Sequence, residues 1–189
     1  MWATPRRTSQ DALAEPVTLE KAKGQCNILE DDAAFDDKLG DLITTAREHV
    51  EAYCGVLFIS RGLTASCDCW RDLARLPVGP VSSVSAITYV DADGNTQTLD
   101  GSAWELRIDG LEAAIVPAFG VTWPAIRAGS RITVTLTAGF GAEGEEPCPK
   151  PVRHAILLFL SQQFEQREPV LIEGQTVFDH LLTNFRRYA

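Results

Sequence analysis

"TAGFGAEGEEPCPKP", residues Thr137 to Pro151, separates a strand-like segment from a helix-like one and decides how this 189-residue chain is organised. It contains the spacing G-x-G-x-x-G at Gly139, Gly141 and Gly144, which binds a dinucleotide when the glycines open a helix directly after a strand. Here the glycines run into acidic residues and prolines, and a proline biases the residue before it away from helical dihedrals. We therefore interpret the stretch as a hinge-like turn and predict no cofactor.

The segments on either side of this turn have different periodicities. Arg131 to Thr137 alternates apolar and threonine side chains, as in a half-buried strand. After the turn, Pro151 suits the first turn of a helix that ends before Pro169. Its apolar positions recur at helical spacing: Val152, Ala155, Ile156, Phe159, Leu160 and Phe164.

Two helices are predicted near the N-terminus. Thr18 suits the N-cap of a short helix from Leu19 to about Cys26. A longer helix follows an acidic group and ends at Gly55, a residue suited to a left-handed C-cap. Its apolar residues are three or four apart: Phe35, Leu39, Leu42, Ile43, Ala46, Val50 and Tyr53.

The region between the helices is predicted to be β. The clearest feature is a hairpin around Asp93-Gly94 in "SAITYVDADGNTQTLD". Asp91, Asp93 and Asn95 resemble a calcium loop, but that loop needs glycine at position six and glutamate at position twelve, so we interpret them as turn residues. Other strands are expected at 56–59, 63–70, 104–108 and 114–116.

A last helix is predicted near the C-terminus. Thr176 and Asp179 have the spacing of a capping box. Phe178, Leu181, Leu182 and Phe185 form one apolar stripe, which suits either packing inside the bundle or a groove on another protein. Arg186 and Arg187 complement the C-terminal end of this helix.

The predicted fold class is α+β: a helical bundle formed by N- and C-terminal helices, with an inserted antiparallel β domain. We expect a flexible arm at 1–16, the bundle at 17–55 and 150–189, and the β insert at 56–149. Helical pairs of about 40 residues are small for independent folding, so the two ends of the chain should pack together.

The composition of the chain argues against several classes of function. The chain has 26 acidic and 17 basic side chains and a net charge of −9, which argues against tight nucleic-acid binding. No apolar run approaches the roughly 18 residues of a membrane helix, and the N-terminus has no apolar segment that predicts secretion. Five cysteines without paired spacing favour reduced thiols in the cytosol, and we interpret Cys67 and Cys69 as structural, with no metal site.

Templates for catalysis are also missing from the sequence. It contains no H-E-x-x-H, no Walker loop and no G-x-S-x-G, and we assign His49, His154 and His180 to helical surface or capping roles. The chain is therefore predicted not to be an enzyme.

An ordered set of segments resembles a known family. The segments start at Pro16, Asp31, Leu76, Val116, Ile132 and Pro151: "PVTLEKAKGQCNI", "DDAAFDDKLGDLITTAREHVEAYCG", "LPVGPVSSVSAITYVDADG", "VPAFGVTWPAIR", "ITVTLTAGFG" and "PVRHAILLFLSQQFEQRE". Taken together over residues 16–188, they resemble the head–tail connector (adaptor) proteins of tailed phages and the related adaptors of gene transfer agents.

This resemblance implies a structural protein of the head–tail junction of a virion or phage-like particle, made in the bacterial cytoplasm. It implies a ring, of twelve subunits, between the portal and a tail-side stopper, with DNA passing through the lumen unbound. The C-terminal segment of such proteins docks onto the portal, and the matching residues here are Leu181, Leu182, Phe185, Arg186, Arg187 and Tyr188.

Two alternatives stay open from the sequence. The chain could be another neck component, such as a stopper or tail-completion protein, whose helices face other partners. It could also be a small ligand-binding domain or enzyme that uses the glycine turn, which a thermal-shift screen against nucleotides and metals would detect.

Overall fold

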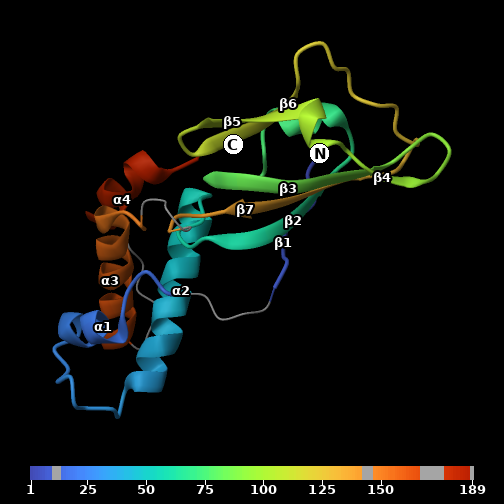
Figure 1. The fold of residues 1–189 in the computed structure, drawn as a ribbon. Helices are drawn as coiled ribbons and strands as arrows, with labels where there is room; N and C mark the ends of the chain where they lie inside the picture. The colour runs from blue at the N-terminus through green and yellow to red at the C-terminus, as the bar shows by residue number, and fades with distance from the viewer. Residues whose placement is uncertain (10–13, 142–146, 167–176, 188–189) are drawn as a thin grey trace.

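The helices lie at one end of the molecule and the strands at the other in the computed structural model, which describes residues 1–9, 14–141, 147–166 and 177–187 (Figure 1). Within these residues the helices are α1 (Leu19–Gln25), α2 (Asp36–Cys54), α3 (Lys150–Glu165) and α4 (Val177–Leu182). Short 3-10 segments are η1 (Trp70–Ala74), η2 (Gly101–Ala103) and η3 (Thr183–Phe185).

The predicted helix ends agree with the structure. The Thr18 hydroxyl accepts the backbone N–H of Lys21 and caps α1. Gly55 caps α2 with a φ of 65°, the left-handed conformation that glycine adopts without strain. Pro151 lies in the first turn of α3, as predicted. Thr176, the predicted cap of the last helix, lies outside the described residues.

Five strands form one antiparallel sheet in the order β1-β2-β7-β3-β4. They are β1 (Arg6–Arg7), β2 (Arg61–Cys67), β3 (Val81–Val90), β4 (Thr96–Thr98) and β7 (Ile132–Ala138). A separate hairpin of β5 (Trp104–Asp109) and β6 (Glu112–Pro117) lies over this sheet as a second layer (Figure 1). The α+β class predicted from the sequence is confirmed.

Two hydrophobic clusters fill the molecule. The first, which we call the bundle core, combines residues from both ends of the chain: Val17, Leu39, Ile43, Val50, Ile156, Leu160 and Leu182. The second, the sheet core, lies between the sheet and the β5–β6 hairpin and includes Leu63, Ile87, Ile115, Val134 and Leu136. The N- and C-terminal helices therefore share one core, because none of them alone can bury its apolar face.

The first residues of the segment predicted as a flexible arm make contacts with the sheet. β1 pairs with β2 at the edge of the sheet, and Trp2 forms a bridge to Cys67. The indole N–H of Trp2 donates to the Arg75 carbonyl at 2.9 Å, and the terminal amine pairs with Asp72 at 2.6 Å. These contacts are made across some seventy residues of sequence, so local composition gives no sign of them.

Two strand predictions need correction. Residues 56–59 form no strand, because the Leu57 N–H donates to the Gly79 carbonyl and the Phe58 N–H donates to the Glu51 carboxylate. β2 ends at Cys67 and is followed by η1, so Cys69 lies beyond the strand and not on one face with Cys67. The other predicted strands are confirmed to within a few residues.

Candidate functional site

The apolar stripe predicted near the C-terminus packs inside the bundle. Leu182 is fully buried in the bundle core, and Phe178, Leu181 and Phe185 pack against it from α4 and η3. Asp179, on the same helix, accepts a 2.6 Å hydrogen bond from the Tyr53 hydroxyl of α2, and this bond raises the pKa of Tyr53. Of the two roles that the sequence left open for the stripe, packing inside the bundle is the one that the structure shows.

The two arginines that follow η3 point in different directions. Arg186 is exposed, and its guanidinium lies 4.5 Å from the centre of the Tyr53 ring. The side chain of Arg187 is only 7% exposed, and its Nη2 donates to the Leu76 carbonyl at 2.8 Å and to Glu112 Oε2 at 2.6 Å. Arg187 was expected to face a partner, and the structure instead turns it into the molecule. Tyr188 lies outside the described residues.

Glu112 on β6 forms ion pairs with two arginines. Arg75 donates to both of its carboxylate oxygens, at 2.8 and 3.1 Å, and Arg187 donates to one of them. Hydrogen bonds from Arg75 and then Arg187 lower the pKa of Glu112 to about 2, because they stabilise its charged form. The backbone N–H of Arg187 also donates to the Cys54 carbonyl at the end of α2. The C-terminal segment thus fastens the bundle to the β5–β6 hairpin.

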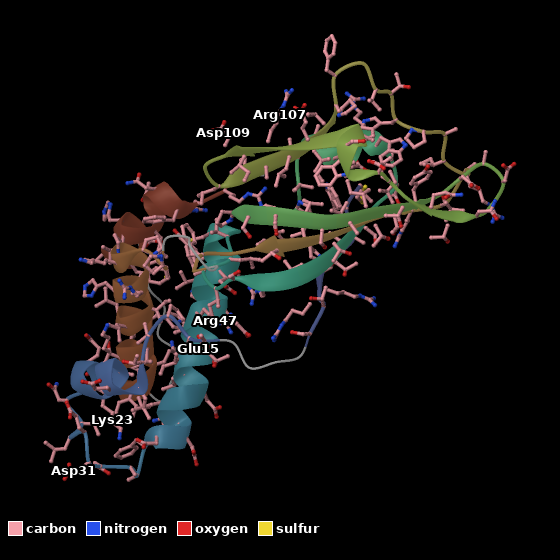
Figure 2. The ribbon with its side chains drawn as sticks, viewed as in Figure 1. Glu15, Lys23, Asp31, Arg47, Arg107 and Asp109 are labelled. Carbon is pink, nitrogen blue, oxygen red and sulfur yellow. The ribbon has the colours of Figure 1, made fainter. Side chains whose placement is uncertain are left out.

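A second junction between the helices and the sheet is buried and charged. Glu51 of α2 accepts from Arg47 at 2.9 Å, from Arg61 of β2 at 2.6 Å and from the Phe58 backbone N–H at 2.8 Å. Arg47 also donates to Glu15, in the segment before α1 (Figure 2). The sequence analysis did not identify this network; the i, i+4 spacing of Arg47 and Glu51 on a mostly apolar helix face was its one visible signal.

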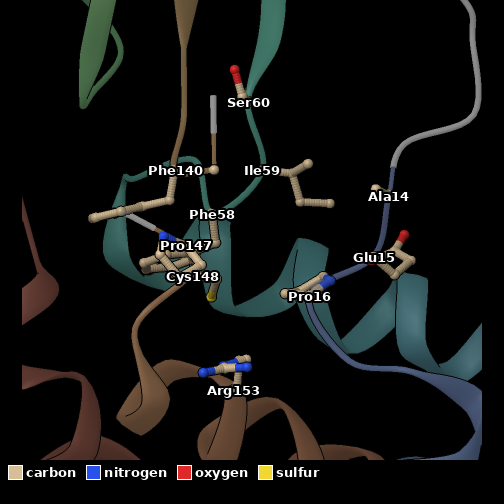
Figure 3. Close-up of a pocket in the computed structure, with 11 residues that line it drawn as sticks. Ala14, Glu15, Pro16, Phe58, Ile59, Ser60, Phe140, Pro147, Cys148 and Arg153 are labelled. Carbon is tan, nitrogen blue, oxygen red and sulfur yellow. The ribbon is translucent and has the colours of Figure 1, made fainter. Parts of the chain in front are cut away.

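The glycine stretch lines a hollow of about 400 Å³ (Figure 3). Phe58, Phe140 and Cys148 contribute apolar surface, and Glu15 and Arg153 contribute charge. Gly139 has a φ of 114°, donates its N–H to the Pro80 carbonyl, and passes so close to Ile59 that a Cβ would collide with the Ile59 carbonyl. Gly144 lies outside the described residues. Because α3 begins only at Lys150, Gly139 and Gly141 do not open this helix. Their conformations agree with the interpretation as a turn.

The remaining sequence motifs have structural partners. Asp91 accepts the backbone N–H groups of Asp93 and Asn95, which closes the hairpin turn, and Gln97 lowers its pKa most strongly among its partners. Cys67 is buried and Cys69 exposed, and burial raises the pKa of Cys67 to about 12. In the part of the chain that the structure describes, no group of three or more His, Cys, Asp or Glu could hold a metal ion.

The histidines lie on helix surfaces. The His49 ring on α2 stacks on Phe159 of α3 with 4.3 Å between centroids, and all three histidines are exposed. None of the described helices is both long enough and apolar enough to cross a membrane.

Comparison with solved structures gives matches over nearly the whole chain. One is a chain in the neck of an empty gene transfer agent particle with C6 symmetry, at a TM-score of 0.80 and 23% identity. A chain in the virion of a native gene transfer agent particle matches equally well, at a TM-score of 0.80 and 23% identity. A third, in the neck of a native particle with C12 symmetry, has a TM-score of 0.71 and 25% identity. Each match covers 99% of this chain and 97% of the other.

This chain has the fold of gene transfer agent neck chains. The likeness includes both the bundle and the β part, since it covers 99% of the residues. No family model and no curated protein matches the sequence. In this chain the C-terminal segment lies at the junction of the bundle and the β5–β6 hairpin, and Arg186 is exposed there.

Proposed function

We propose that this chain is a non-enzymatic structural component of the neck of a gene transfer agent or phage-type particle. The observation that carries the proposal is the near full-length likeness to chains in such necks. Within the neck, we assign it the role of head–tail connector (adaptor), a ring between the portal and the tail-side stopper through which DNA passes.

A ring is supported by the cyclic symmetry of the related necks. The necks of those particles were computed with C6 and C12 symmetry, and a closed ring needs two different, complementary surfaces on every subunit. Twelve chains of 20.6 kDa give a ring of about 250 kDa. With a net charge of −9 per chain, acidic groups that face the lumen repel phosphate, which suits a channel through which DNA slides.

Deleting the gene and imaging the particles tests the neck assignment. Particles without this chain should lack one ring of the neck and carry no tail, and the chain supplied from a plasmid should restore both. The same images distinguish an adaptor from a stopper. An adaptor ring contacts the portal directly, whereas a stopper lies one ring farther from the portal. Particles with complete necks in the deletion strain would contradict the proposal.

The portal contact is proposed for the edge of the C-terminal segment that carries the half-buried Leu181 and Phe185 and the exposed Arg186. Tyr188, which follows in the sequence, belongs to the same proposal but lies outside the described residues. Leu182 and Arg187 support this edge from inside, since both are buried. Arg186→Glu should weaken capture by immobilised portal, while Arg107→Glu, on the exposed β5 strand, should not. If immobilised portal captures both variants equally well, the portal contact does not involve Arg186.

A further inference from the structure

A hollow with basic walls lies between α1 and α3. It has a volume of about 270 Å³, and Val17 and Leu157 form its apolar bed. Lys21, Lys150, Arg153 and His154 surround it, and we call these four residues the basic hollow. Among the described residues, no carboxylate lies within ion-pair distance of Lys21, Lys150 or Arg153.

Lys21 and Lys150 are exposed and Arg153 is half-buried, so these cations form a positive patch on a chain with a net charge of −9. The buried cations Lys23, Arg47 and Arg187 each have a carboxylate within 3 Å. Arg153 also faces the neighbouring hollow lined by the glycine turn (Figure 3). Among the described residues that line it, the one carboxylate is Glu15, which is already bonded to Arg47 and Thr44. The described part of the chain thus leaves the basic hollow without a counter-charge.

An exposed group of acids lies beyond the other end of α1. We call Glu30, Asp31, Asp32, Asp37 and Asp41 the acidic ridge. Two cations lie near these acids in the sequence. Lys23 is bonded inside the bundle, where its Nζ contacts Asp36 at 2.6 Å and the Glu30 carbonyl at 3.0 Å. Lys38 is exposed, and its Nζ lies 4.4 Å from the centre of the Phe164 ring. The ridge carboxylates have no cationic partner within ion-pair distance in the described residues, and Asp31 lies at the tip of the bundle farthest from the sheet (Figure 2).

We propose that the acidic ridge of one copy binds the basic hollow of the next copy in the ring. The two surfaces have opposite charge, and α1, a helix of about 10 Å, separates them within one molecule. They are different patches of one chain, as the head-to-tail contacts of a closed ring require. This inference rests on the proposed function and adds to it the contact between subunits.

Phosphate is the competing ligand for a basic hollow. Three cations are few for a nucleic-acid surface, which gains affinity by neutralising many phosphates. The net charge of −9 also repels a polyanion over the rest of the molecule, whereas a short acidic segment meets only the hollow. We therefore choose the protein ligand and leave DNA binding as an outcome of the test.

Two charge-reversed variants of the full chain test the contact. In the first, Lys21, Lys150 and Arg153 become glutamate; in the second, Glu30, Asp31 and Asp32 become lysine. Each variant alone should associate at least about tenfold more weakly than the wild type, because repulsion replaces attraction at the three side chains that are changed. A 1:1 mixture should regain association, since each hollow now meets a ridge of opposite charge. Sedimentation velocity measures the mass, starting from the 20.6 kDa monomer.

Rescue by mixing separates a lost contact from a misfolded variant, because two misfolded chains do not repair each other. Wild-type association should also weaken when salt rises from 0.1 to 1 M, as the Debye length falls from about 10 to about 3 Å. The proposal is overturned if the wild type stays monomeric, if the variants associate normally, or if the mixture stays dissociated. The proposed function is tested separately, by imaging the necks of particles from the deletion strain.

Two further outcomes would show that the basic hollow binds something other than the acidic ridge. A short DNA duplex that binds the wild type but not the first variant would make it a phosphate site. Glu143, Glu145 and Glu146 stand shortly before Lys150 in the sequence. If replacing these three by alanine abolishes association while the Glu30 to Asp32 reversal does not, the occupant is not the acidic ridge.

Discussion

At the scale of single residues, the ion pairs of Glu112 make stability depend on pH. Its pKa is lowered from 4.5 to about 2. A carboxylate with a lowered folded-state pKa stabilises the fold above its unfolded-state pKa and loses this effect as the pH falls toward the folded-state value. The side chain is 39% exposed, so we expect Glu112→Gln to cost only about 1 kcal/mol at pH 7 and clearly less at pH 2, where part of the Glu112 population is protonated.

Urea unfolding at pH 7, 4 and 2 measures this difference. Glu105→Gln, at an exposed position on the paired strand β5, is the matched control and should be nearly neutral at each pH. A Glu112→Gln effect that stays constant from pH 7 to pH 2 would show that the charge of Glu112 is not its cause.

Gly139 and Gly141 allow a second test at this scale. Both have positive φ, but only at Gly139 does an added Cβ meet other atoms, the backbone of Ile59 and Ser60. We expect Gly139→Ala to lower the free energy of unfolding by about 2–4 kcal/mol and Gly141→Ala by about 1 kcal/mol. Thermal unfolding compares the two; equal effects would mean that the close approach at Gly139 contributes nothing.

The turn at these glycines could be predicted from the sequence, because the prolines that follow them disfavour a helix at that point. It could not predict that Arg187 is buried. The residue stands next to the chain end, where an arginine is usually solvated, and its partner Glu112 is 75 residues away. Nothing in the local sequence distinguishes Arg187 from the exposed Arg186.

At the scale of elements, the buried Glu51 joins α2 to β2 and to the segment between them. Glu51→Ala would leave Arg47 and Arg61, whose side chains are 3% and 13% exposed, without this partner. Removing one partner of a buried ion pair typically costs about 3–5 kcal/mol, so we expect a loss of this size in urea unfolding.

Glu48→Ala is the control for this prediction. Glu48 also contacts Arg47, at 3.3 Å, but its side chain is 66% exposed, so its loss should cost less than about 1 kcal/mol. Similar losses for both variants would mean that burial of the network does not determine its contribution.

Glu51 also explains why an element was predicted wrongly. The run Val56 to Ile59 is apolar and β-branched at both ends, which favours a strand. Its Phe58 N–H bonds instead to the Glu51 side chain, and this bond depends on where α2 ends in space. Helices were predicted better because their caps and periodicity are local, as at Thr18 and Gly55.

At the scale of the whole molecule, apolar periodicity and the small size of each helical pair were enough to predict that the helices from the two halves of the chain pack together, as the shared bundle core shows. The order of the sheet was not predictable in the same way. The pairing of Gly62 with Thr137 joins segments 75 residues apart, and no local signal fixes such a register. The division into arm, bundle and β insert stays a prediction.

Leu182 tests whether the last helix completes a core that the first helices begin. Its side chain is fully buried beside Val17, Val50 and Ile156 in the bundle core. We expect Leu182→Ala to cost about 2–5 kcal/mol, because the cavity it leaves lies among residues from both chain ends. Val177→Ala on the same helix, at a site that is 66% exposed, should change stability by less than about 0.5 kcal/mol. If hydrogen exchange of Leu182→Ala shows faster opening of α4 alone, with α1 and α2 protected as before, the two chain ends do not form one cooperative unit.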